Sequence, residues 1–212
     1  INIDANKREL HGKALQLVPV VLSEFPNLSL QYPIVLTKHA ETGEFVFVIM
    51  LGFEAGENLF WQKEQWQGLY LPLHIRRQPF FIGNPDSSVQ QQTNDGDYVV
   101  CIDQDSPAIA SEGGVALFDE KGVDTDYFQE AKSCLAQLIK GESENKRLIE
   151  HLKEMDLLQS MSLEVTFVNQ QTTRLNGLYT VNQEKMAKLT DEQILMLYKA
   201  GVLPAIYTLI TS

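Results

Sequence analysis

The chain has 212 residues, 44% of them hydrophobic, which is enough to bury a core as one large domain or as one domain with an appendage. It carries 17 Lys and Arg residues against 28 Asp and Glu residues, so its formal net charge at pH 7 is -11. This balance argues against a general binder of nucleic acid or of anionic membranes, because such proteins hold phosphates with clustered basic residues.

Three further features predict a cytoplasmic protein without a transmembrane segment. No apolar run approaches the roughly 20 residues that cross a bilayer. The first residues do not show the basic, apolar and small-residue succession of a secretion signal. The two cysteines, Cys101 and Cys134, are too few for a disulfide framework, and their apolar neighbourhoods predict buried free thiols.

The first quarter of the chain predicts three extended segments. Residues 14–22 (ALQLVPVVL) are typical of a buried strand in which Pro19 requires an edge or a kink. Residues 34–38 (IVLTK) form the second segment. Residues 41–53 contain a turn at Thr42-Gly43 and then a β-branched and aromatic run, which is the strongest strand signal of the sequence.

A dense aromatic stretch follows. Residues 56–68 predict a hairpin whose tight polar turn is flanked by Trp61 and Trp66. Pro72 and Pro79 bracket a short helix of about two turns, because proline suits a first helical position and also stops a helix.

The middle of the chain predicts extended pieces joined by loops. Residues 80–83 (FFIG) and 98–103 (YVVCID) are strand-like. Residues 84–97 contain almost no apolar side chain and predict a polar surface loop. Residues 111–122 predict a second loop, anchored by the apolar pair Leu117-Phe118.

The second half changes from strands to helices. From Asp126 the apolar residues recur at helical spacing, and Gly141 is expected to cap the end of this helix. Asp126 and Gln129 have the spacing of a capping box. A second helix is expected from about Ser143.

The C-terminal part predicts a hairpin and further helical pieces. Residues 162–181 have alternating apolar side chains, with a turn near residues 170–171 and a bulge at Asn176-Gly177. Thr190 with Gln193 is expected to cap a helix that Gly201 ends. Residues 203–211 then predict one or two more helical turns.

Together these elements predict an α+β fold. A mixed, mainly antiparallel sheet is built by the N-terminal half and the late hairpin, and three to four helices come from the C-terminal half. The expected organisation is one domain over residues 1–212, with residues 110–125 as a candidate boundary within it.

The sequence contains no local signature of a familiar active site. It has no G-x-S-x-G elbow, no G-x-x-x-x-G-K-[ST] loop and no G-x-G-x-x-G after a strand. Its four histidines are scattered, without the H-x-x-x-H spacing of a zinc helix, and we therefore expect neither a metal site nor a cofactor. The absence of these signatures favours a protein that is not an enzyme.

The acidic turn CIDQDSP has part of the pattern of a calcium loop. Asp103 and Asp105 have the spacing of the first two ligands, but Ala108 and Gly114 stand where glycine and glutamate are needed. Two alternatives remain for Asp103 and Ser106. They form a turn in which carboxylates accept local backbone N–H groups, or they line a cleft as weak catalytic candidates together with Glu57.

The basic pair Arg76-Arg77 leaves a similar choice. Adjacent helical residues point about 100° apart, so at most one of them shares a face with His74 or Tyr70. Either an arginine forms a structural ion pair, or it binds a carboxylate or phosphate, for which the planar guanidinium is suited. Trp61 is either a stacking wall for a ligand or a packing anchor.

The order and spacing of nine segments over nearly the whole chain resemble the SapC family of bacterial proteins. The segments are LVPVVLSEFP, YPIVL, LGFEAGENLF, WQGLYLP, RRQPF, CIDQDSP, LFDEKG, LNGLYTV and AGVLPAIYTLI; the glutamine-rich SSVQQQTNDGD is a mild departure. The resemblance implies a soluble protein associated with surface-layer export, encoded near flavin-dependent halogenase-like proteins, cupin-type proteins and TonB-dependent receptors. It carries over no catalytic residue. Its polar motif positions are Glu57, Arg76, Arg77, Asp103, Ser106 and Asp119.

Three functional hypotheses follow. The first is a soluble accessory or binding protein for a peptide, a protein or a small anionic ligand in a surface-layer or export-uptake pathway, with Arg76, Arg77, His74, Tyr70, Trp61 and Asp119 as ligand-binding residues. The second is an enzyme, or an enzyme partner, that uses a carboxylate and arginine cluster and acts with halogenase-like or cupin-type proteins. The third is an interaction module, with a homodimer through Trp61 and Trp66 as one version.

Overall fold

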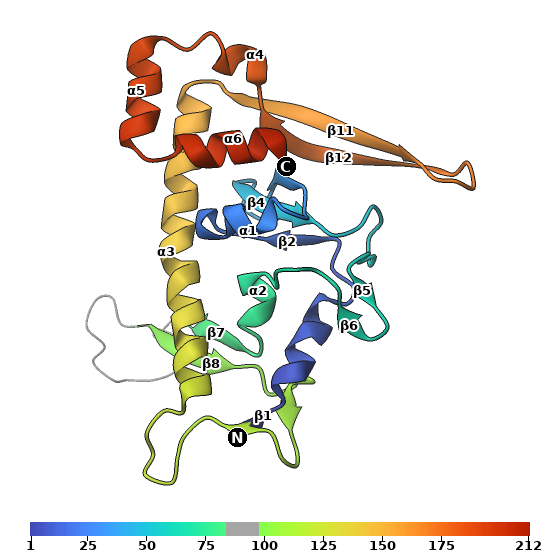
Figure 1. Cartoon of the computed structure of the whole chain (residues 1–212), viewed down its shortest axis with the longest axis vertical. Coiled ribbons are helices and arrows are strands. Elements are labelled where there is room, and N and C mark those ends of the chain that lie inside the picture. Colours follow the sequence, from blue (N-terminus) through green and yellow to red (C-terminus); the bar gives the residue numbers. More distant parts are fainter. Residues whose placement is uncertain (84–97) are drawn as a thin grey trace. The chain divides into compact units, whose positions relative to one another are not determined.

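The computed structural model describes residues 1–83 and 98–212, so the predicted polar loop 84–97 lies outside the described residues. The described chain divides into two compact units. The first unit contains Ile1–Gly12 and Leu73–Ile139, and the second contains Lys13–Pro72 and Lys140–Ser212. Residues 110–125 lie inside the first unit. The predicted α+β class with antiparallel sheets is confirmed (Figure 1).

The first unit is built on short antiparallel strands. Strand β1 (Asn2–Ile3) lies between β9 (Ile109–Ala110) and β10 (Val115–Ala116), and β7 (Phe80–Gly83) pairs with β8 (Val99–Ile102). Its core is a cluster of buried apolar side chains: Ile3, Phe80, Ala108, Leu117 and Leu135.

The prediction of a plain loop over residues 111–122 was wrong in part, because Val115–Ala116 pairs with the N-terminal strand. This pairing partner is distant in sequence and leaves no local signal. Of the two predicted anchors, Leu117 is 6% exposed whereas Phe118 is 51% exposed. Only the first is therefore part of the core.

The second unit contains a five-stranded antiparallel sheet with the order β11-β12-β3-β4-β2 (Figure 1). Its strands are β2 (Leu17–Pro19), β3 (Ile34–Lys38), β4 (Phe45–Met50), β11 (Leu158–Thr166) and β12 (Thr172–Val181). Pro19 lies on the edge strand, as predicted, where its missing N–H group costs no ladder hydrogen bond. The bulge is also confirmed, because the β11–β12 register shifts opposite Gly177, which has φ 77°.

The tryptophan hairpin is confirmed. Strands β5 (Trp61–Gln62) and β6 (Gln65–Trp66) pair so that Trp61 lies opposite Trp66. Lys63 and Glu64 form the two-residue loop, and both have positive φ values of 52° and 57°. Two successive left-handed residues are what a type I′ hairpin turn requires.

Two predicted helices are in fact one. Helix α3 runs over 29 residues from Asp126 to Glu154, so the expected end at Gly141 was wrong. A Cβ at Gly141 would overlap the Cβ of Val21 and lie 2.7 Å from its Cγ1. The glycine therefore permits close packing inside the second unit rather than a helix stop. At the start of α3, Thr125 Oγ1 accepts the N–H of Phe128 at 3.5 Å.

We expect Gly141→Ala to lower the free energy of unfolding of the second unit by about 1–2 kcal/mol. Alanine is about 1 kcal/mol better than glycine in a helix, but overpacking against Val21 costs more. Ser143→Ala, at an exposed position of the same helix, is the control and should be neutral or slightly stabilising. Denaturant titration followed by tryptophan fluorescence measures both, because both tryptophans lie in the second unit. A stabilised Gly141→Ala protein would show that the Val21 contact does not constrain this position.

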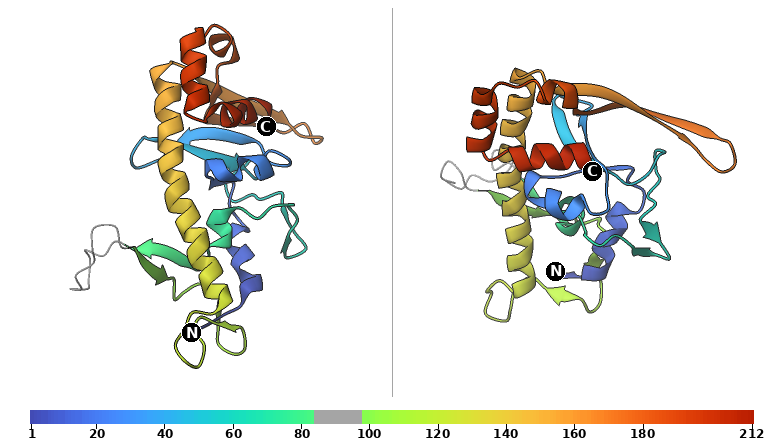
Figure 2. Two further views of the ribbon diagram at one scale, coloured as in Figure 1. Left: turned by 60° about the vertical axis from the view of Figure 1, so that its left-hand side comes forward. Right: turned by 45° about the horizontal axis from the view of Figure 1, so that its top comes forward.

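The C-terminal helices follow their predicted signals. Helix α5 (Asp191–Lys199) begins with a capping box between Thr190 and Gln193, and Gly201 after its end has φ 72°. Helix α6 (Leu203–Thr211) packs beside β12 and beside the short helix α1 (Phe25–Leu28) (Figure 2). A single turn, α4 (Gln183–Met186), follows β12.

In the parts of the chain that the structure describes, no single helix has both the length and the apolar composition needed to cross a membrane; α5 and α6 meet that criterion only as a pair, which is bent by 100°.

Candidate functional site

A polar hollow of about 380 Å³ in the first unit contains the first arginine of the basic pair. We call it the Arg8 pocket. It is lined by Arg8, Arg76, Tyr127, Glu130, Ala131, Ser133, Cys134 and Gln137. The lining residues come from the 3-10 helix η1 (Ala5–Gly12), from the single turn α2 (Leu73–Arg76) and from the first turns of α3.

Local packing fixes the elements around the Arg8 pocket. In α2, Leu73 and Ile75 are each 1% exposed, which anchors the turn and leaves the alternate residues His74 and Arg76 only half-buried. The thiol of Cys134 is buried and donates to the carbonyl oxygen of Leu73 at 3.6 Å. Arg76 therefore lies on a short turn whose backbone is fixed by the burial of Leu73 and Ile75 and by the hydrogen bond from Cys134.

Arg8 is the most unusual member of the pocket. Its Nε atom is buried and has no hydrogen-bond partner among the described residues. Within residues 1–83 and 98–212, no carboxylate lies within ion-pairing distance of its guanidinium. Buried polar groups are nearly always hydrogen-bonded, so an unsatisfied one indicates a missing partner such as water or a ligand.

The electrostatics of the pocket favour a negatively charged guest. Burial raises the pKa of the Tyr127 hydroxyl, the charge of Arg8 acts against that rise, and Glu130 adds to it. Tyr127 is therefore a neutral hydrogen-bond donor at pH 7. Two guanidinium groups and one phenol supply N–H and O–H donors to the same hollow, with the exposed Glu130 as the opposing charge.

The second arginine of the pair lies in a different place. Arg77 Nη1 donates to the carbonyl oxygen of Phe80 at 2.6 Å, and Arg77 lines a shallow depression with Asp103. The backbone N–H of Asp103 donates to the Pro79 carbonyl at 3.0 Å, which holds the acidic turn against the start of β7. Arg76 thus lines the Arg8 pocket, whereas Arg77 lines the separate depression beside Asp103.

Ser106 of the acidic turn is buried and contacts the half-buried His11 of η1. His11 Nε2 lies 2.9 Å from Ser106 Oγ, which also accepts the N–H of Ala108 at 3.1 Å. Burial lowers the pKa of His11, while Asp103 raises it and Arg77 lowers it. Because Ser106 is only 5% exposed, its hydroxyl acts as a hydrogen-bond bridge in this arrangement rather than as an open nucleophile.

Asp103 and Asp119 both stabilise turns. Asp103 Oδ1 accepts the N–H of Asp105 at 3.0 Å. Asp119 Oδ1 accepts the N–H groups of Lys121 and Val123, each at 2.8 Å. These contacts are local side-chain to backbone bonds typical of Asx turns.

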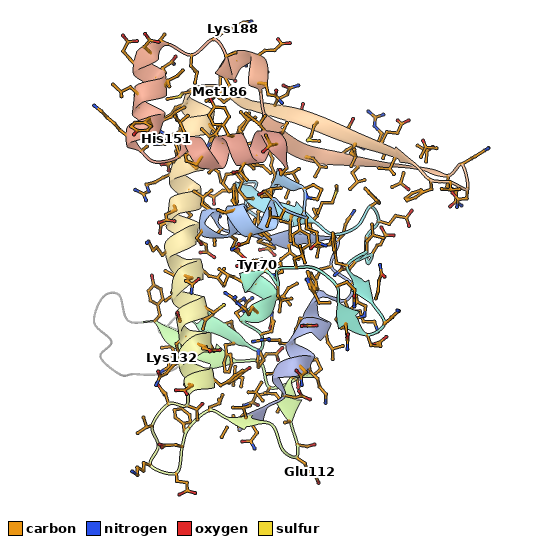
Figure 3. The ribbon with its side chains drawn as sticks, in the orientation of Figure 1. Tyr70, Glu112, Lys132, His151, Met186 and Lys188 are labelled. Atoms are coloured by element: carbon orange, nitrogen blue, oxygen red, sulfur yellow. The ribbon has the colours of Figure 1, made fainter. Side chains whose placement is uncertain are left out.

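Three predicted site residues belong to the second unit. Glu57 Oε2 accepts the N–H of Phe53 at 2.6 Å. Tyr70 accepts the hydroxyl of Tyr32 on its carbonyl oxygen at 2.8 Å, and Figure 3 labels its position. The indole Nε1 of Trp61 is buried without a hydrogen-bond partner among the described residues. The predicted set is therefore divided between the units, with His74, Arg76, Arg77, Asp103, Ser106 and Asp119 in the first.

Sequence reasoning missed Arg8 and Tyr127. Arg8 lies in NKRELHG, which carries no motif, and only the fold brings η1 beside α2. Tyr127, Ala131 and Cys134 follow one another at helical spacing, so a second stripe on the predicted helix was visible in the sequence. Among the described residues, no group of three His, Cys, Asp or Glu side chains is placed to hold a metal ion.

Comparison with known proteins gives one match. A family model described as SapC matches residues 1–212, which is the whole chain. No curated protein and no solved structure matches the sequence.

Proposed function

The chain belongs to the SapC family, and we propose that it is a binding protein whose Arg8 pocket takes the carboxylate or phosphate group of a small anionic ligand. The observation that carries the proposal is the Arg8 guanidinium, whose buried Nε lacks a partner in a hollow shared with Arg76 and Tyr127. The pocket volume of about 380 Å³ suits a metabolite-sized guest. An accessory role in a surface-layer or uptake pathway is the context that the family resemblance implies.

The geometry supports recognition of an oxyanion in particular. A guanidinium offers a planar fork of donors that matches carboxylate and phosphate oxygens, and two such groups line the pocket. Tyr127 can donate a third hydrogen bond. An anion bound beside the Arg8 guanidinium would neutralise its charge, which has no carboxylate partner among the described residues.

We expect inorganic phosphate, citrate or succinate to bind the wild-type protein, as measured by calorimetric titration at low salt. Arg8→Gln should weaken the affinity by about tenfold to a hundredfold, because hydrogen bonds to charged groups contribute roughly 1.5–3 kcal/mol. Hydrogen exchange should show new protection in η1, in α2 and at the start of α3.

Lys7→Gln is the matched control. It removes the same charge from the adjacent residue of η1, whose side chain is 52% exposed. We expect it to change the affinity less than threefold, since the whole-protein charge is a weak influence compared with a direct hydrogen bond. Equal losses in both variants, or no binding of any of the three anions to the wild type, would contradict the proposal.

A further inference from the structure

A second hollow lies in the second unit and differs in chemistry from the Arg8 pocket. We call it the proline groove. It has a volume of about 380 Å³ and is formed by three segments: residues 22–26, residues 200–208 and one face of α3. All of its lining residues belong to the second unit.

The walls formed by residues 22–26 and 200–208 are mainly apolar. Pro26 and Pro204 stand in the first turns of α1 and α6, where their fixed φ suits the helix start. Phe25 and Val202 are buried beside them. The neighbouring residues Ala200, Gly201 and Ala205 have side chains too small to fill the space. Small side chains on this wall therefore leave space for a guest.

The face of α3 that lines the groove is polar. Arg147 and His151 are four residues apart and so lie on the same side of the helix, and Glu144 precedes Arg147 by three. Figure 3 labels His151 near the end of α3. The Nδ1 atom of His151 is buried without a hydrogen bond, 3.9 Å from the Glu154 carboxylate.

Arg147 is an exposed residue of this face, which it shares with Glu144 and His151. Glu144 pairs with Lys140 at 3.7 Å. Over residues 1–83 and 98–212, no carboxylate lies within 4.0 Å of the Arg147 guanidinium. The groove therefore offers an exposed guanidinium without an ion pair among the described residues, and a half-buried imidazole, next to an apolar wall.

We propose that the proline groove binds a carboxylate that carries an apolar group, with the carboxylate on Arg147 and His151 and the apolar group against Phe25, Val202 and Pro204. Such a carboxylate has two sources, an aryl- or alkyl-carboxylic acid and the free C-terminus of a peptide that ends in an apolar residue. Both place one negative charge a few bonds from an apolar body, which is the pattern of the groove.

The test is a calorimetric titration with three probes: 3-phenylpropanoate, its uncharged amide, and acetyl-Ala-Ala-Phe with a free carboxylate. We expect the acid to bind at least tenfold more tightly than the amide. If the peptide binds more tightly than 3-phenylpropanoate, the ligand is the C-terminus of a peptide. If 3-phenylpropanoate binds at least as tightly as the peptide, the ligand is a small molecule. Backbone amide shifts of Gly201 and Ala205 should move on titration.

Arg147→Gln should weaken binding of the acid about tenfold, because the group that it removes contacts the carboxylate. Lys146→Gln is the matched control, since it removes the same charge from an exposed neighbour that points about 100° away along the helix. It should leave the affinity within twofold. Arg8→Gln should also leave the affinity for the acid unchanged, so the proposals for the proline groove and for the Arg8 pocket are tested independently.

Three results would overturn the proposal. They are equal affinity for acid and amide, equal losses in Arg147→Gln and Lys146→Gln, and no detectable binding of either carboxylate at millimolar concentration.

Discussion

Gly68→Ala should lower the free energy of unfolding of the second unit by about 2–4 kcal/mol. A Cβ at this position would fall on the hydroxyl of Tyr32 and lie 2.5 Å from Nε1 of Trp66. Tyr32 cannot give way, because it is 1% exposed and its ring packs against Phe60 with centroids 4.6 Å apart. The substitution therefore forces either the backbone or a buried aromatic ring to shift.

The same hydroxyl links two parts of the aromatic stretch. Tyr32 donates to the carbonyl of Tyr70 at 2.8 Å and accepts from Trp66 Nε1 at 3.1 Å. Displacing the hydroxyl would break both of these hydrogen bonds, which adds to the cost of overpacking. Denaturant titration followed by tryptophan fluorescence measures the loss directly, since Trp66 is itself part of this network.

Two further variants sharpen the Gly68 prediction. Leu69→Ala, at a position 82% exposed, should change the unfolding free energy by less than about 0.5 kcal/mol. Tyr32→Phe removes the obstructing hydroxyl, so Gly68→Ala should cost less in that background than in the wild type. A Gly68→Ala protein as stable as the wild type would mean that the Tyr32 hydroxyl does not occupy this space.

The second large effect is a loss of stability of the first unit at acid pH through His74. Burial lowers the pKa of His74 from 6.5 to about 4, and the positive charge of Arg77 acts in the same direction. Between pH 6.5 and pH 4 the unfolded chain takes up a proton that the folded protein excludes, so stability falls as the pH falls. Above pH 6.5 His74 is neutral in both states and does not change the stability. Below pH 4 it is protonated in both states, and the loss of stability is complete.

The size of the His74 effect is on the order of 3 kcal/mol, from the difference between the folded and unfolded pKa values. We expect hydrogen exchange of the first unit to show this loss of unfolding free energy between pH 7 and pH 4. Over the same range, the unfolding free energy of His74→Gln should fall by about 3 kcal/mol less than that of the wild type. His11, whose pKa is also lowered by burial, leaves a residual slope in the variant. His39→Gln, at an exposed position, is the control. Parallel profiles for wild type and His74→Gln would refute the assignment.

Local sequence signals predicted much of this fold. The capping box at Thr190, the bulge at Gly177 and the edge position of Pro19 depend on backbone chemistry within a few residues, and all three were readable. At Gly141 the local signal led to a wrong prediction, because α3 continues through this residue. A glycine at a plausible helix end follows a local rule, but here the close approach of Val21 explains it, and that contact exists only in three dimensions.

The candidate site was less predictable than the fold. The arginine pair was visible because the two residues are adjacent, and in the structure Arg76 and Arg77 line different hollows. Arg8 had no comparable signal, because a lone arginine in a polar stretch is usually solvated. The burial of its Nε atom arises only in the folded chain.

The chain passes between its two units three times, at residues 12–13, 72–73 and 139–140. A nascent polypeptide leaving the ribosome therefore exposes the central strand β1 before its neighbours β9 and β10 have been translated. The first unit can close once Ile139 has emerged, whereas the second must wait for its C-terminal segment. Vectorial synthesis thus imposes an assembly order, in which β1 stays unpaired until residues 109–116 have been translated.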